Sequence, residues 1–390
     1  MASLSDYFKW RGDITFDKSP LNEIDSLIFT QLCYIPLKGV VSKSFEENGI
    51  TIKQYYEENV ENKKNLEKMG ALIPNEKIWV LCKFAANSPR FENVRMRGYV
   101  REIDNTREKQ FCALCFDLPD NTTYISFCGT DDTIVGWKEN FNMALFTPVP
   151  AQNDSVEYLN KFSETNDRKI YLGGHSKGGN LAIYAGFMSN ERVRNSILAI
   201  HNFDGPGFRY DFLLIARKNT EIASKVINFL PDSTIIGAIF DTIGARIYVR
   251  SRAKGVGQHD LFTWYLQPAT NFMTVDKISK TSIQFHNTLE RWVANMDDKE
   301  KVEFIDAFYK LCKANDADTL TDIMTSKRKF VSALFNVDEK SKKVLWRVMS
   351  GSVKEYFVGS DVKPVAVKDG KKIQLEKTAK SQKASAQKKK

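Results

Sequence analysis

The 390 residues are 42% hydrophobic, 12% aromatic and 27% charged, which excludes a disordered chain and leaves ample sequence for a large core. No run of about 18 residues is apolar and uncharged, which excludes a membrane-spanning helix. The net charge of +9 resides mostly in residues 361–390, which hold 10 Lys and 3 acidic residues, so the body of the protein is almost neutral.

The start of the chain has no basic region followed by an apolar one, so no secretory signal is expected. The six cysteines are scattered along the chain, which suits free thiols in a reducing compartment better than a disulfide framework. These two observations predict a cytoplasmic location.

Helical spacing of apolar residues dominates the first part of the chain and predicts a mainly helical segment over residues 1–95. One helix is expected in residues 22–35, with Asn22 or Asp25 near its N-terminus as a cap. A second helical stretch, rich in Glu and Lys, covers residues 44–70.

From residue 96 the spacing changes to that of strands. The runs MRGYVREID, KQFCALCFDL and TTYISFCG are separated by turn residues at 104–105 and 119–121, which predicts an antiparallel meander ending at Cys128. A helix is expected at residues 137–144.

Strands and helices then alternate. Strands are predicted at residues 169–173, 197–203, 226–230 and 245–250, and helices at 180–188 and 212–224. Such alternation indicates a mostly parallel sheet covered by helices, so residues 96–273 are predicted to form an α/β core.

The rest of the chain is expected to be helical and then disordered. Helices are predicted at residues 275–296, 298–314, 318–335 and 338–356, within a C-terminal helical region over 274–358. Residues 359–390 lack aromatics and are rich in Lys, Ser, Ala and Gln, which is typical of a disordered tail.

The sharpest motif is KIYLGGHSKGGNLAIYAGF, residues 169–187, which contains a G-x-S-x-G pattern at 174–178. An apolar strand precedes the pattern and a helix-forming run follows it, which is the context of a nucleophile elbow. Such a turn would present Ser176 Oγ at the carboxyl end of the sheet. The Lys177 N–H would then lie at a helix N-terminus, where it can stabilise an oxyanion.

A serine nucleophile requires a base, and in this fold the order along the chain is Ser, acid, His. The chain has four histidines. His175 lies inside the elbow and His201 lies in a strand, so we favour His259, in the Gly-containing loop KGVGQHDLFTW. His286, on an amphipathic helix, stays open as the alternative base.

The acid should end a strand between Ser176 and the histidine. We favour Asp232, which follows the strand KVINFLP, because its carboxylate could hold the imidazole tautomer. Asp204, at the end of the preceding strand, is the competitor, and Asp241 and Asp260 are weaker candidates. Thr130, directly after the strand TTYISFCG, is expected to supply the second oxyanion donor.

Several of these segments resemble class 3 lipases, the fungal-lipase-like α/β-hydrolases. GHSKGGNLA looks like the family's GHSLGGALA elbow, and FCGTDDTIVGWKENF is similar to its F-R-G-T…D-W…N oxyanion segment. FDGPGF, VINFLPDSTI and QHDLFTW are similar to the family's F-G-x-P strand end, its acid-bearing strand end and its His-plus-aromatic ending. The resemblance covers roughly residues 96–266 and looks closest to a bacterial Mbeg-like branch.

The chain departs from the family pattern at three positions and in one spacing. Lys177 replaces the usual Leu, Cys128 stands where Arg is common, and Gly136 stands where an Asp precedes Trp. The Ser176-to-Asp232 spacing fits the family, whereas the spacing from Asp232 to His259 is short, which keeps His286 open.

The resemblance implies an α/β-hydrolase fold. The reaction predicted from Ser176, Asp232 and His259 is hydrolysis of a carboxylic ester, of a lipid or another acyl compound, with no metal or organic cofactor. Acyl transfer and thioester hydrolysis on the same triad remain open, as does an inactive hydrolase-like scaffold that binds a partner or an anionic membrane. The Lys-rich tail could associate weakly with anionic lipid or nucleic acid. Cys112 and Cys115, three apart on a strand, should face opposite ways and share no metal.

Overall fold

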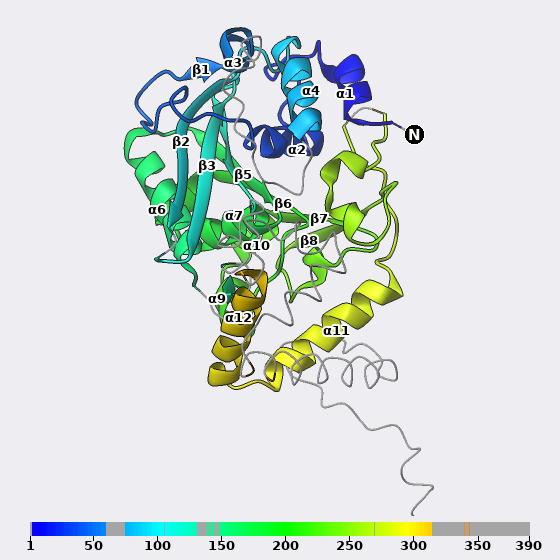
Figure 1. Cartoon of the computed structure of the whole chain (residues 1–390). Coiled ribbons are helices and arrows are strands. Elements are labelled where there is room, and N and C mark those ends of the chain that lie inside the picture. The colour runs from blue at the N-terminus through cyan, green and yellow to red at the C-terminus, as the bar shows by residue number, and fades with distance from the viewer. Residues whose placement is uncertain are drawn as a thin grey trace, which may run out of the picture.

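The computed structural model describes residues 2–59, 75–104, 106–130, 139, 142–143, 148–268, 270–313, 339 and 343. In these residues one mixed sheet of eight strands runs through the molecule, with helices on both sides (Figure 1). The strands lie in the sheet in the order in which they occur in the chain: β1 (Ile50–Thr51), β2 (Arg95–Asp104), β3 (Lys109–Asp117), β4 (Thr122–Phe127), β5 (Lys169–His175), β6 (Ile197–Phe203), β7 (Val226–Pro231) and β8 (Ala245–Val249).

The sheet changes direction at β4. Strands β1 to β4 pair antiparallel, which confirms the predicted meander, and β4 to β8 pair parallel. The turn between β3 and β4 shows why the meander forms: Asp120 Oδ1 accepts hydrogen bonds from the Thr122 N–H and hydroxyl, and Asn121 has φ of 66°. Asp and Asn are common in turns because the Asp side chain can accept from the backbone and Asn tolerates a positive φ.

The mostly parallel sheet and its covering helices confirm the predicted α/β fold class.

Helices cover each face of the sheet. One face carries α2 (Glu23–Leu32), and a second helix, α4 (Asn75–Ala86), packs against it; the other face carries α6 (Pro150–Thr165) and α7 (Lys177–Met188). The Asn22 side chain caps α2 by accepting from two backbone N–H groups, as the sequence predicted. Among the described residues before 225, the other helices are α1 (Leu4–Arg11), α3 (Ile52–Asn59), α8 (Glu191–Ser196), α9 (Tyr210–Lys218) and α10 (Thr220–Ser224).

The structure corrects some boundaries. The stretch predicted as helical over residues 44–70 contains the short strand β1 before α3, and residues 60–74 lie outside the described part of the chain. The sequence did not predict α6, which begins at Pro150 after a segment without clear spacing. The helix predicted at residues 137–144 falls mostly outside the described residues.

Alternate residues of β3 enter different cores. Cys112, Leu114 and Phe116 pack with α2 and α4, whereas Phe111, Ala113 and Cys115 pack with α6 and α7. This alternation confirms that Cys112 and Cys115 face opposite sides of the sheet. Burial on both faces explains why β3 reads as a continuous apolar run.

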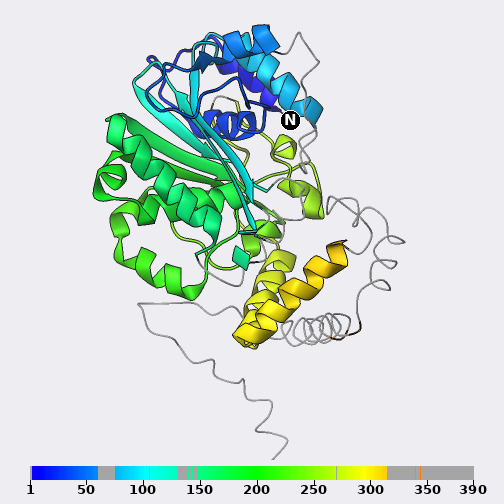
Figure 2. The same ribbon diagram turned by 60° about the vertical axis from the view of Figure 1, so that its left-hand side comes forward.

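Two further helices, α11 (Lys280–Ala294) and α12 (Asp298–Lys313), follow the sheet. They lie at the end of the molecule opposite to α1 and α4, and the sheet lies between the two groups (Figures 1 and 2). The helices predicted at 318–335 and 338–356, and the Lys-rich tail, fall almost entirely outside the described residues. No helix in the described part of the chain has the length and apolarity needed to cross a membrane.

Candidate active site

Ser176 occupies the sharp turn between β5 and α7, as the sequence predicted for a nucleophile elbow. Its backbone has φ of 57° and ψ of −129°, a conformation that costs free energy for any residue other than glycine. The Ser176 N–H donates to the Phe203 carbonyl at the end of β6, at 3.0 Å, and the Ser176 carbonyl accepts from the Gly179 N–H. The neighbouring strand and the following helix therefore hold the strained turn.

The glycines of the motif make this turn possible. A Cβ atom at Gly178 would collide with the Phe127 carbonyl, and one at Gly174 would collide with the backbone of Gly178. The helix α7 can therefore approach the ends of β4 and β5 only because these positions lack side chains.

His259 lies at the end of a short 3-10 helix, η3 (Gly255–His259), and is buried. Its Nδ1 atom lies 2.7 Å from Asp204 Oδ2, so a hydrogen bond joins the imidazole to a carboxylate. Such a bond fixes the tautomer in which Nε2 can accept a proton.

His175, the residue before Ser176, docks His259 against the elbow. The His175 Nε2–H donates to the His259 carbonyl at 2.9 Å, and the two rings lie 4.3 Å apart between centroids. Burial holds the pKa of His175 well below its usual value, and the nearby His259 lowers it further, so His175 is neutral near pH 7. The sequence indicated no role for this histidine.

The carboxylate partner of His259 is Asp204 and not Asp232, which corrects the favoured prediction. Asp204 directly follows β6, is almost fully buried and has φ of 50°. Its Oδ1 atom accepts from the Thr234 hydroxyl and from the Gly237 N–H, the latter at 3.2 Å. These donors and the imidazole hold the carboxylate in place.

The order of the strands explains the correction. β6 lies next to β5, which ends just before Ser176, whereas β7, which precedes Asp232, lies one strand further away. Asp232 instead accepts from Gln258 Nε2 at 2.7 Å, and Gln258 Oε1 accepts from the Ser233 N–H. Asp232 therefore tethers the loop one residue before His259.

The other candidates from the sequence lie elsewhere. His286 is on α11, where its Nδ1 contacts the Ala238 carbonyl at 3.0 Å. Asp260 pairs with Lys77 at 2.6 Å, and Asp241 lies 3.3 Å from the Arg246 guanidinium. The hydrogen bond to Asp204 thus distinguishes His259 from His286.

The predicted oxyanion loop follows β4 and packs on the elbow. A Cβ atom at Gly129 would lie 2.6 Å from the His175 carbonyl and 3.3 Å from Ser176 Cβ. The Gly129 N–H donates to the Tyr34 hydroxyl at 2.7 Å, so a residue of the N-terminal region fixes the loop just before Thr130. Gly136, the departure noted above, lies outside the described residues.

The side chain of Lys177 forms a buried ion pair and hydrogen bonds that the sequence did not predict. Its Nζ atom is buried and lies 2.8 Å from Glu139 Oε2, 2.7 Å from Gln110 Oε1 and 2.6 Å from the Gln110 carbonyl. Glu139 also accepts from the backbone N–H of Gln110 and Ala151. Gln110 Nε2 in turn donates to the Gly129 carbonyl at 3.3 Å, so this network connects the start of α7 to the oxyanion loop.

Cys128, the other departure, lies in a cluster of three buried thiols beneath the same loop. Its Sγ atom is 2.7 Å from Cys33 Sγ and 2.9 Å from Cys112 Sγ. Burial raises the pKa of the Cys33 and Cys128 thiols well above the usual value. These two thiols are therefore protonated at neutral pH, and they pack as small apolar groups in the core.

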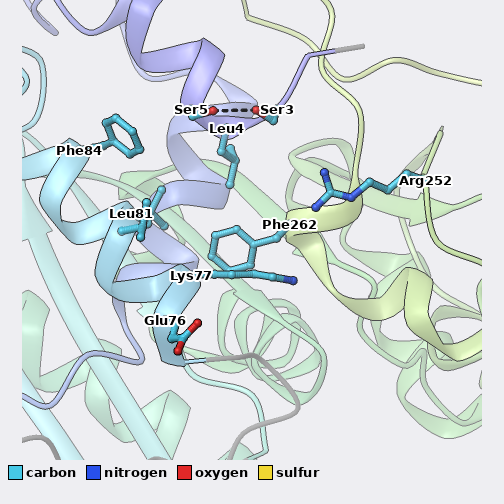
Figure 3. A pocket seen from close by; sticks show the side chains of 10 residues that line it. Ser3, Leu4, Ser5, Glu76, Lys77, Leu81, Phe84, Arg252 and Phe262 are labelled. Atoms are coloured by element: carbon cyan, nitrogen blue, oxygen red, sulfur yellow. Dashed lines mark hydrogen bonds between the residues drawn. The ribbon is translucent and has the colours of Figure 1, made fainter.

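A groove of about 380 Å³ lies beside the segment that carries His259 (Figure 3). Lys77, on its wall, lies 5.7 Å from the centre of the Phe262 ring and pairs with Asp260, the residue after His259. Ser176 does not line it. The groove lies between α1, α4 and the 3-10 helix η4 (Leu261–Thr263) and is lined by Ser3, Leu4, Ser5, Glu76, Lys77, Val80, Leu81, Phe84, Arg252 and Phe262.

Comparisons with known proteins show which family the chain matches. Two solved structures of the Rhizomucor miehei lipase propeptide complex, one native and one a deletion mutant, share 14% and 15% sequence identity with the chain, each at a TM-score of 0.33. They cover 52% and 53% of this chain, which in turn covers 64% and 69% of theirs. No curated protein matches the sequence. Residues 85–310, more than half of the chain, match the Mbeg1-like family, and the protein therefore belongs to that family.

Proposed function

We propose that the protein is a serine hydrolase that cleaves carboxylic esters, of lipids or of other acyl compounds. The observation that carries this proposal is the junction between the elbow and the base. Ser176 lies in a strained turn, and His175, the residue before it, donates to the carbonyl of His259. The imidazole of His259 is in turn hydrogen-bonded to Asp204. A nucleophile, a base and an orienting carboxylate in the chain order Ser, Asp, His form the arrangement of this enzyme class.

Each residue has a step in the proposed reaction. Ser176 Oγ attacks the ester carbonyl while His259 takes its proton, and Asp204 holds the imidazole and stabilises its charged form. The backbone N–H of Lys177, at the start of α7, and that of Thr130 stabilise the oxyanion. His259 then protonates the leaving alcohol, and water cleaves the acyl-enzyme with His259 again as the base.

The proposal is tested by labelling the purified full-length protein with a fluorophosphonate probe and by assaying p-nitrophenyl esters of short and long chains. We expect the wild type to label and to turn over, and Ser176→Ala to do neither. Ser224→Ala, an exposed serine on α10, is the matched control and should behave like the wild type.

Each result has a distinct meaning once circular dichroism shows that the variants are folded. A folded wild type that neither labels nor turns over would contradict the proposal and favour a hydrolase-like binding scaffold. A protein that labels at Ser176 without hydrolysing esters would move the proposal to thioesters or acyl transfer.

The proposed location is the cytoplasm, which the five free thiols of the described residues support.

A further inference from the structure

A second cluster of ionisable side chains lies outside the proposed hydrolytic site. Asp241 precedes β8, and His286 and Glu290 lie on α11. One ligating atom from each residue, the imidazole nitrogen and two carboxylate oxygens, lies within 4.8 Å of the other two. The cluster thus joins the C-terminal helical region to the sheet.

The histidine of this cluster is oriented like a metal ligand. His286 and Glu290 are four residues apart on a helix, so their side chains lie on one face. The His286 Nδ1–H donates to the Ala238 carbonyl at 3.0 Å, which leaves the lone pair on Nε2. A backbone carbonyl that holds one ring nitrogen while the other is available is the usual support for a metal-bound histidine.

The two carboxylates need a positive partner at the same point. A carboxylate oxygen of Asp241 lies within 4.8 Å of one of Glu290, so two like charges face each other at this point. The Arg246 guanidinium is 3.3 Å from Asp241 Oδ1, and this ion pair is about 40% exposed and therefore weak. A bound cation between the three groups would remove the repulsion between Asp241 and Glu290.

We propose that Asp241, His286 and Glu290 bind a divalent transition-metal ion, with Zn²⁺ as the best fit. One imidazole and two carboxylates, with water as a fourth ligand, suit tetrahedral Zn²⁺, whereas Ca²⁺ and Mg²⁺ prefer sites built of oxygen alone. Ligand bonds of about 2.0–2.2 Å place ligating atoms about 3.4 Å apart. Side-chain rotation within the cluster can provide this spacing.

The ion would fasten α11 to a turn that supports the proposed triad. Ala238, which holds His286, ends the 3-10 helix η2 (Ile236–Ala238), and the Gly237 N–H of the same turn donates to Asp204. The metal has a structural role here and takes no part in the ester chemistry. This inference therefore does not depend on the proposed hydrolase activity.

The test measures Zn²⁺ binding to the full-length protein after treatment with a chelator and dialysis. We expect one tightly bound ion per chain at pH 7 and a melting temperature that rises with Zn²⁺. His286→Ala and Glu290→Gln should each weaken binding at least tenfold and abolish the thermal shift. Asp276→Asn, which removes an exposed carboxylate outside the cluster, is the matched control and should bind as the wild type does.

Cobalt substitution identifies the ligands. A Co²⁺ spectrum of nitrogen and oxygen ligands, lost in Glu290→Gln, would support the site. A thiolate charge-transfer band would place the ion at Cys33, Cys112 and Cys128 and overturn the proposal, as would Zn²⁺ affinity that survives both substitutions. Glu290 is exposed, so its variant should fold even if His286→Ala does not. Absence of Zn²⁺ binding to the folded wild type would also overturn the proposal.

Discussion

The elbow and the acid–base pair are built in opposite ways. The elbow is local, because Gly174, Ser176 and Gly178 lie within five residues of the chain. The two glycines leave space for the backbone to approach closely, and Ser176 adopts the positive φ of the turn. Asp204 and His259 are 55 residues apart in the chain and meet only when β6 and η3 come together. A sequence motif therefore identifies the elbow, whereas the acid of the acid–base pair depends on which strand end lies beside the nucleophile.

Replacement of Asp204 would break the pair directly. Asp204→Asn preserves the shape but can present an amide N–H to His259 Nδ1, which disfavours the productive tautomer. We expect kcat on a p-nitrophenyl ester to fall by up to about 10⁴-fold, the size seen for the equivalent change in serine proteases. Steady-state kinetics on the folded variant measure this effect. Activity near that of the wild type would show that Asp204 is not the orienting carboxylate.

The buried pair of Lys177 and Glu139 is one of the non-local supports of the elbow, and its removal would show how far the elbow depends on distant residues. Lys177→Met leaves the Glu139 carboxylate buried without its partner, so we expect the free energy of unfolding to fall by about 3–5 kcal/mol in urea titrations. The double variant Lys177→Met/Glu139→Gln should recover part of this loss. An equal loss in the double variant would mean that the cost comes from packing and not from the charge.

β6, the strand directly before Asp204, contains the buried His201, and we expect the protein to lose stability as the pH falls. Burial lowers the pKa of His201 to about 4, below its value of 6.5 in an unfolded chain. The unfolded state therefore binds the proton first, and stability falls as the pH falls from 6.5 to 4, by up to about 1.4 kcal/mol per pH unit from this group. Denaturant titrations at several pH values should show this slope, and His201→Gln should reduce it.

The smallest effect on activity and stability is expected for replacement of Asp232, which follows β7. Asp232→Asn keeps an oxygen that can accept from Gln258 Nε2, so we expect kcat to change by no more than about threefold and stability by about 0.5 kcal/mol. The same assays as for Asp204→Asn make the comparison direct. A loss at Asp232 as large as that at Asp204 would restore the original assignment.

The sequence predicted the parts of the molecule whose cause is local. The meander, the parallel strands and the strand–turn–helix around Ser176 all follow from periodicity and turn residues. The sequence favoured Asp232, whereas the structure hydrogen-bonds Asp204 to His259; an Asp directly follows each of two neighbouring strands, and only the order of these strands in the sheet separates the two residues. The contacts of His175 with His259 and of Lys177 with Glu139 join residues 84 and 38 positions apart, which no local pattern indicates.

Each strand of the sheet pairs with the strand that precedes it in the chain. The sheet can therefore grow by one strand at a time as the chain leaves the ribosome, without waiting for a distant segment. The turn at Ser176 is an exception to this simple growth, because its N–H donates to Phe203 at the end of the next strand. We expect a nascent chain that ends before β6 to leave this turn relaxed, so that the nucleophile acquires its strained geometry only after β6 has been synthesised and paired.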